Sequence, residues 1–234
     1  MKSKRSVIGE WRNPVSIIIG ILLFGSIWGF FEATLGGFLN MIIFPNKGAI
    51  MSGIGVAVMG GALAIYRKPS MLPGIGIVAA SFKLLNVGLL FVPISAIYII
   101  NPAMAIIFES LAFCLVAVFV MNRMAKNAFY GIGAGFLAGL MSAAAYVYFA
   151  VYAMHAPLFE RMGVNSVGGF IVNQGLVQAA FFGILLPLGY LVGERLAAKT
   201  FSVSISKPLY YYATSAAIIC LCWGISAVTV MAGL

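Results

Sequence analysis

The chain has 234 residues, of which 63% are apolar and only 8% are charged, and its mean hydropathy is +1.09. A soluble domain carries roughly a quarter charged residues, and a globule of this size has too little interior to hide so much apolar surface. The composition therefore excludes a water-soluble fold and predicts a membrane protein whose outer face is covered mostly by lipid.

Seven apolar runs are long enough to cross a bilayer, since a helix needs roughly 20 apolar residues to do so. Separate spans of this kind must be helices, because a helix satisfies its own backbone hydrogen bonds in lipid. We therefore expect an all-α membrane protein, a polytopic helical bundle of about seven transmembrane helices that forms a single domain over 1–234. The runs cover about 15–43, 49–66, 72–92, 102–122, 128–153, 168–194 and 209–232.

The first run carries a small residue at every fourth position, namely Gly25, Gly29, Ala33 and Gly37. This spacing places small side chains on one side of a helix, so that a neighbouring helix can approach backbone to backbone. Packing inside the bundle is one interpretation, and docking of a separate membrane subunit on this face is the other. The fifth run repeats the pattern with Gly131, Gly135 and Gly139.

The chain has a net charge of +9, and its basic residues cluster mostly between the apolar runs. Cytoplasmic connections of membrane proteins are enriched in Lys and Arg, and this rule places the N-terminus in the cytoplasm, with Lys47 and Arg161 outside. We therefore expect a multi-pass protein of the cytoplasmic (inner) membrane and no nucleic-acid partner. The basic residues on the predicted inner side are Lys2, Lys4, Arg5, Arg12, Arg67, Lys68, Arg123, Lys126, Arg195, Lys199 and Lys207.

Three ionisable residues fall well inside the predicted spans: Glu32 in the first, Lys83 in the third and Glu109 in the fourth. Each costs several kcal/mol in hydrocarbon unless it faces a cavity or a partner. A structural ion pair is one explanation, and a site that binds a ligand or relays a proton is the other.

Amides gather on the same side of the predicted membrane as these charges. Asn173, Gln174 and Gln178 begin the sixth run, while Asn40, Asn86 and Asn101 lie at corresponding depth. We expect a polar cavity toward the outside with aromatic walls drawn from Trp28, Phe31, Tyr98, Tyr146 and Tyr148. The predicted ligand contacts are Trp28, Glu32, Lys83, Asn86, Glu109, Asn173, Gln174 and Gln178.

Sequence patterns typical of catalysis and of cofactor binding are missing. His155 has no second His or Cys nearby, which argues against a structural metal site. There is no phosphate-binding loop, no Ser-His-Asp set and no HExxH pattern, so we expect neither ATP hydrolysis by this chain nor an enzyme. We expect no cofactor, and Cys114, Cys220 and Cys222 to be small apolar residues rather than disulfides.

The organisation of the first six runs resembles the substrate-binding S components of energy-coupling-factor vitamin transporters. The resemblance rests on the small size, the outward polar pocket and the tract that holds Trp28-Gly29, Glu32, Pro45, Lys47-Gly48 and Lys83. It implies a six-helix core, capture of a vitamin-like micronutrient outside, and a transmembrane coupling protein that docks on Gly25, Gly29, Ala33 and Gly37. It also implies that ATPase subunits supply the energy. The run 209–232 departs from the family by adding a seventh span.

Three functions stay open from sequence. The first is a membrane-embedded solute-binding subunit for uptake of a small micronutrient, in contact with lipid and with partner subunits. The second is a self-sufficient proton-coupled secondary transporter or channel in which Glu32 or Glu109 is the coupling group. The third is a non-catalytic membrane subunit of a larger complex, in which the charges are structural pairs.

Overall fold

A computed structural model describes residues 14–42, 44–155 and 166–233, and within these ranges every regular element is helical. Seven helical segments are long and apolar enough to span a membrane, which confirms the predicted all-α polytopic bundle. In chain order the elements are α2 (Pro14–Met41), α3 (Lys47–Tyr66), η1 (Pro69–Met71), α4 (Leu72–Ser81), α5 (Leu84–Leu90), α6 (Ile97–Met124), α7 (Ala128–Tyr148), η2 (Phe149–Ala153), α9 (Val167–Phe170), η3 (Ile171–Gly175), α10 (Leu176–Ser206) and α11 (Pro208–Met231).

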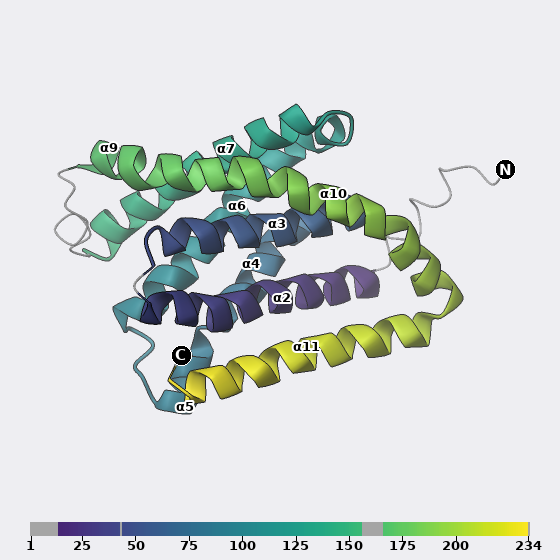
Figure 1. Ribbon diagram of the computed structural model, residues 1–234, viewed down its shortest axis with the longest axis horizontal. Coiled ribbons are helices and arrows are strands. Elements are labelled where there is room, and N and C mark those ends of the chain that lie inside the picture. The colour runs from purple at the N-terminus through teal and green to yellow at the C-terminus, as the bar shows by residue number, and fades with distance from the viewer. Residues whose placement is uncertain (1–13, 43, 156–165, 234) are drawn as a thin grey trace.

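Helix α3 forms the centre of the bundle, with α10, α2 and α6 around it (Figure 1). It is the most deeply buried of the seven spans. Glycines at its contact with α10 bring the two backbones together: a Cβ on Gly193 would overlap the carbonyl oxygen of Gly61, and one on Gly60 would lie 3.0 Å from the carbonyl oxygen of Leu186. The hydrophobic effect does not drive helices together in lipid. The close backbone packing that these small residues allow holds the two helices together instead.

The glycine face of α2 packs against α4 of the same chain. A Cβ on Gly25 would lie 2.5 Å from the Cβ of Val78, and one on Gly29 would overlap the ring of Phe82. At these two positions the structure therefore supports internal packing rather than an open face for a separate subunit. The corresponding face of α7 is also internal, because Gly139 lies against Ala179 of α10.

Helix α11 lies at the edge of the bundle, alongside α2, with its C-terminal end near α5 (Figure 1). It is the least buried span. Two polar contacts hold it in place: near its N-terminal end the hydroxyls of Tyr66 and Tyr211 are 2.7 Å apart, and farther along the indole Nε1 of Trp223 donates to Ser26 at 3.2 Å. The seventh run is therefore a genuine span that is added to one side of a six-helix core.

The sixth span is longer than the sequence predicted. Its apolar run ends near Glu194, whereas α10 continues to Ser206, so Arg195 and Lys199 lie on a helix instead of in a connection. Residues 195–206 contain neither Gly nor Pro, and the helix ends at Lys207, directly before Pro208. Hydropathy marks where a span leaves the apolar layer, not where its helix stops.

The third span is broken in the middle, which the sequence did not predict. Helix α4 ends at Ser81 and α5 begins at Leu84, and the intervening amides bond three residues back, as from Lys83 to Ala80 at 3.0 Å. Phe82 sits at the break, wedged between Gly29 and the ring of Trp223, whose centroid is 4.1 Å away. The packing of Phe82 between α2 and α11 fixes where Lys83 lies.

Candidate functional site

Three adjoining polar pockets lie at the end of the bundle where α2 ends and α3 and α6 begin; we call it the polar end. The Glu109 pocket, of about 270 Å³, is lined by Gly48, Ala49, Ser52, Asn101, Pro102, Ala105, Glu109, Ser142, Tyr146, Phe170, Gln174 and Gln178. The ion-pair pocket, of about 220 Å³, is lined by Glu32, Gly36, Asn40, Lys47, Gly48, Met51, Ser52, Lys83, Tyr98, Pro102, Ala105, Ile106 and Glu109. The edge pocket, of about 250 Å³, is lined by Glu32, Ala33, Gly37, Asn40, Met41, Phe82, Lys83, Asn86, Tyr98, Val230 and Gly233.

The three pockets adjoin one another through shared walls. Ser52 and Glu109 line both the Glu109 pocket and the ion-pair pocket, while Glu32 and Lys83 line both the ion-pair pocket and the edge pocket. The three ionisable residues that the sequence placed inside the membrane therefore converge on one pocket. Together the walls form a polar tract across the bundle from α7 and α10 to α11.

Glu32 and Lys83 form the ion pair of this tract. The Lys83 Nζ is 3.4 Å from Oε2 of Glu32 and 3.4 Å from its backbone carbonyl oxygen. Their side chains are 10% and 17% exposed, so the pair is shielded from lipid but still borders the pockets. Glu32 lies one turn after Gly29, the glycine that admits Phe82, and this places Glu32 beside the helix break that carries Lys83.

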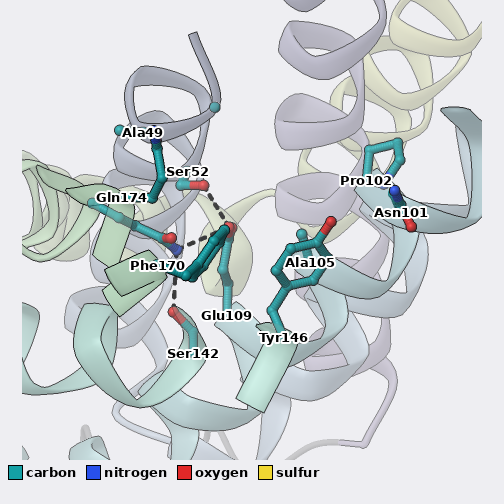
Figure 2. A pocket seen from close by; sticks show the side chains of 12 residues that line it. Ala49, Ser52, Asn101, Pro102, Ala105, Glu109, Ser142, Tyr146, Phe170 and Gln174 are labelled. Atoms are coloured by element: carbon teal, nitrogen blue, oxygen red, sulfur yellow. Dashed lines mark hydrogen bonds between the residues drawn. The ribbon is translucent and has the colours of Figure 1, made fainter. Parts of the chain in front are cut away.

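Glu109 accepts hydrogen bonds from two side chains, one of which also bonds to a third side chain (Figure 2). Ser52 of α3 donates a hydrogen bond to its Oε1, and the Nε2 of Gln178 donates to the same oxygen at 3.2 Å. Gln178 also donates to the hydroxyl of Ser142 at 3.1 Å. Side chains of α3, α6, α7 and α10 thus meet in one network around a carboxyl group.

The second carboxyl oxygen of Glu109 is unsatisfied. Glu109 is only 3% exposed, and its Oε2 is buried without a hydrogen-bond partner among the described residues. The Oδ1 of Asn101, on the same pocket, is also buried and unpartnered. A buried acceptor without a donor costs about 1–3 kcal/mol, and more when it is charged. The pocket is therefore built with acceptors that a bound molecule can satisfy.

Helical irregularities occur beside the Glu109 pocket. Gln174, which lines it, belongs to the π-helical segment η3 before α10, and a second π-helical segment, η2, ends α7. Pro102 sits inside α6 and has no N–H to offer to the carbonyl of Tyr98, one turn before it. Such interruptions of the helical hydrogen-bond ladder are frequent at functional sites of membrane proteins.

Most of the predicted ligand contacts reach the polar tract. Glu32, Lys83 and Glu109 line it, as do Asn86, Gln174 and Gln178. Of the predicted aromatic walls, Tyr98 and Tyr146 are wall residues of the pockets.

Two predicted contacts lie elsewhere. Trp28 is fully buried against Gly55 of α3, in the apolar core, and its indole nitrogen has no partner among the described residues. Asn173 is exposed and does not belong to the walls of these pockets. Tyr148, which was predicted as an aromatic wall, stacks on Tyr152, is 55% exposed and does not line these pockets. Position in a span gave the depth of these residues but not the face of the helix on which they lie.

Ser52, Ser142 and Lys47 are site residues that the sequence did not single out. Serines are common in membrane helices, where they bond their own backbone, so Ser52 and Ser142 carry no signal by themselves. Lys47 was assigned to an outer connection, yet it opens α3, donates to the side chain of Asn40 and lines the ion-pair pocket. Its proximity to Asn40 follows from the tight turn between α2 and α3.

Comparisons with known proteins add nothing to this geometry. No protein-family model, no curated protein and no solved structure matches the chain.

Proposed function

We propose that this protein is a membrane-embedded solute-binding subunit for the uptake of a small, vitamin-like micronutrient. The observation that carries the proposal is the convergence of Glu32, Lys83 and Glu109 on one pocket at the polar end. Ionised groups are expensive inside a membrane, and they are kept where they contact a substrate or an ion. A chamber with charges of both signs, amides and aromatic walls has the composition of a site for a small polar solute.

The charges of the connections give the direction of binding. Arg67 caps the C-terminal end of α3 and Arg123 lies in the last turn of α6, so both are at the end opposite the polar pockets. Basic residues mark the cytoplasmic side. We therefore place the protein in the cytoplasmic membrane with its N-terminus inside, and the polar tract is positioned to receive a solute from outside.

The proposal assigns the energy source to other proteins. The sequence has no phosphate-binding loop, and its first six spans resemble S components, which implies a transmembrane coupling protein and ATPase subunits. Because Val78 of α4 covers Gly25 and Phe82 covers Gly29, the coupling protein would have to dock without these two glycines of the predicted face.

The first experiment asks whether the chain holds a solute. Native mass spectrometry of the protein, released from its detergent micelle after gentle purification, is expected to show a retained small molecule. Its Kd is expected to rise at least tenfold in Glu32→Gln and Lys83→Met, with Asn173→Ala as the matched control outside the pockets. An unchanged Kd in both variants, with normal folding, would remove the ion pair from the site.

A proton-coupled transporter is the second candidate, and one observation favours it. Glu109 is buried without a basic partner among the residues of its pocket, as a carboxyl that picks up and releases a proton would be. Purified protein alone, reconstituted in liposomes, would then accumulate solute when a pH gradient is applied. A subunit that needs separate ATPases binds solute under these conditions but does not accumulate it.

A further inference from the structure

The Glu109 pocket lacks a positive charge of its own. The side chains that line it include one carboxyl and several amides and hydroxyls but, among the described residues, no Lys, Arg or His. The basic groups of the polar tract lie on the adjoining pocket, where Lys83 is paired with Glu32 and Lys47 donates to Asn40. A buried carboxylate needs a counter-charge or donors to both oxygens.

The hydrogen bonds around Glu109 leave one of its two carboxyl oxygens without a donor from the described residues. Ser52 and Gln178 both donate to Oε1, whereas Oε2 receives nothing from the described residues. The unpartnered Oδ1 of Asn101 is a further acceptor on the same pocket. The missing component is therefore a hydrogen-bond donor, and a cationic N–H donor would neutralise the carboxylate as well.

The remaining walls suit a flat, positively charged group. The rings of Tyr146 and Phe170 line the pocket with their centroids 6.2 Å apart and an interplanar angle of 41°. Aromatic faces attract cations, most strongly where water is excluded, and they also stack on planar rings. Figure 2 shows Tyr146 and Phe170 on the same pocket as Glu109.

We propose that the Glu109 pocket binds a cationic nitrogen group of the solute, such as an amidinium, an ammonium or a protonated nitrogen heterocycle, through Oε2 of Glu109. This inference rests on the proposed function and names the class of solute. The adjoining ion-pair pocket, with Lys47 and Lys83 on its walls, then receives the remainder of the molecule.

The test uses three probes of the same shape and different charge: benzamidinium, benzamide and benzoate. Binding to the purified full chain in detergent is measured by ligand-observed NMR titration. We expect benzamidinium to bind at least tenfold more tightly than benzamide, and benzoate to bind least. Glu109→Gln is expected to abolish this preference, while Asn173→Ala, which is exposed and lies outside the pockets, retains it.

Equal binding of benzamidinium and benzamide to the wild-type chain, or a preference for benzoate, would overturn the inference without any variant. The wild-type comparison stands even if Glu109→Gln fails to fold. If a retained solute is found by native mass spectrometry but has no cationic nitrogen, the proposed function stands and this inference fails. If neither a retained solute nor probe binding is found, both fail.

Discussion

Glu109 is a buried carboxyl group whose hydrogen bonds come from side chains of other helices. It is 3% exposed, and its hydrogen bonds come from side chains of α3 and α10, far apart in the sequence. Because so little of this side chain is exposed, water cannot readily replace a donor that the carboxyl group loses. The stability of the polar end should therefore depend on the few side chains that donate to this carboxyl group.

Ser52→Ala tests this dependence. The substitution removes one of the two donors to Oε1 and is expected to lower the free energy of unfolding by about 1.5–3 kcal/mol, the net contribution of a hydrogen bond to a charged group. The measurement is unfolding by SDS titration in mixed micelles. Ser204→Ala is the matched control, because Ser204 donates only to the carbonyl of its own helix at Phe201, and it should change little. Equal effects of the two substitutions would contradict the assigned network.

The Glu32–Lys83 pair makes a second prediction at this scale. Glu32→Gln and Lys83→Met each leave one group without its partner at 3.4 Å, so each should destabilise the protein. The double variant should recover part of the loss, with a coupling of about 0.5–3 kcal/mol in a double-mutant cycle. Strictly additive effects would show that the two groups do not interact.

The sequence predicted which ionisable groups matter but not all of the groups that hold them. Glu32, Lys83 and Glu109 stand out because charges are rare in apolar runs. Ser52 and Ser142 do not, because their importance comes from helices that meet only in the folded chain. For Trp28 the sequence indicated a ligand contact, because it lies one turn from Glu32 in the same helix. In the structure it packs on Gly55 of α3 instead of lining the pockets.

At the scale of elements, glycines set how closely the helices pack. On α7, Gly133 has no neighbour within 4 Å of an added Cβ, whereas a Cβ on Gly135 would overlap the backbone carbonyl of Phe182 in α10. Backbone cannot move aside as a flexible side chain can. The two glycines therefore have opposite roles although they are only two residues apart.

Alanine substitution separates these roles. Gly133→Ala should be neutral or stabilise the protein by about 0.5–1 kcal/mol, because Ala is the better helix former. Gly135→Ala should destabilise it by about 1–3 kcal/mol, since α7 and α10 must move apart. SDS unfolding of the two variants, side by side, measures the difference. If Gly135→Ala proves as harmless as Gly133→Ala, the close packing of α7 on α10 is wrong.

Element boundaries were predictable only where the sequence has a local signal. Pro208 ends α10, and Asn127 caps α7 by accepting from the amide of Phe129. The break between α4 and α5 has no Gly or Pro at Phe82 and Lys83, and it follows from tertiary contacts with Gly29 and Trp223. The sequence could not reveal it, because those contacts join three spans.

At the scale of the whole molecule, seven candidate spans predict that the two termini lie on opposite sides of the membrane. A fusion of alkaline phosphatase after Leu234 should be active, and a fluorescent protein that matures only in the cytoplasm should be dark at the same position. With the domains fused before Met1, the pattern should reverse. Identical results at both ends would contradict either the seven spans or their orientation.

The proposed solute-binding function depends on a wet chamber that reaches the outside of the cell through the polar end. Cysteine accessibility in intact cells tests this most directly, in a chain whose own Cys114, Cys220 and Cys222 are replaced by alanine. Ala105→Cys, on the wall shared by the Glu109 and ion-pair pockets, is predicted to react with a membrane-impermeant thiol reagent added outside. Ala134→Cys, which is 3% exposed in the apolar core, is predicted not to react. If Ala105→Cys does not react in a folded chain at the cell surface, the chamber does not open to the outside and the proposed function is contradicted.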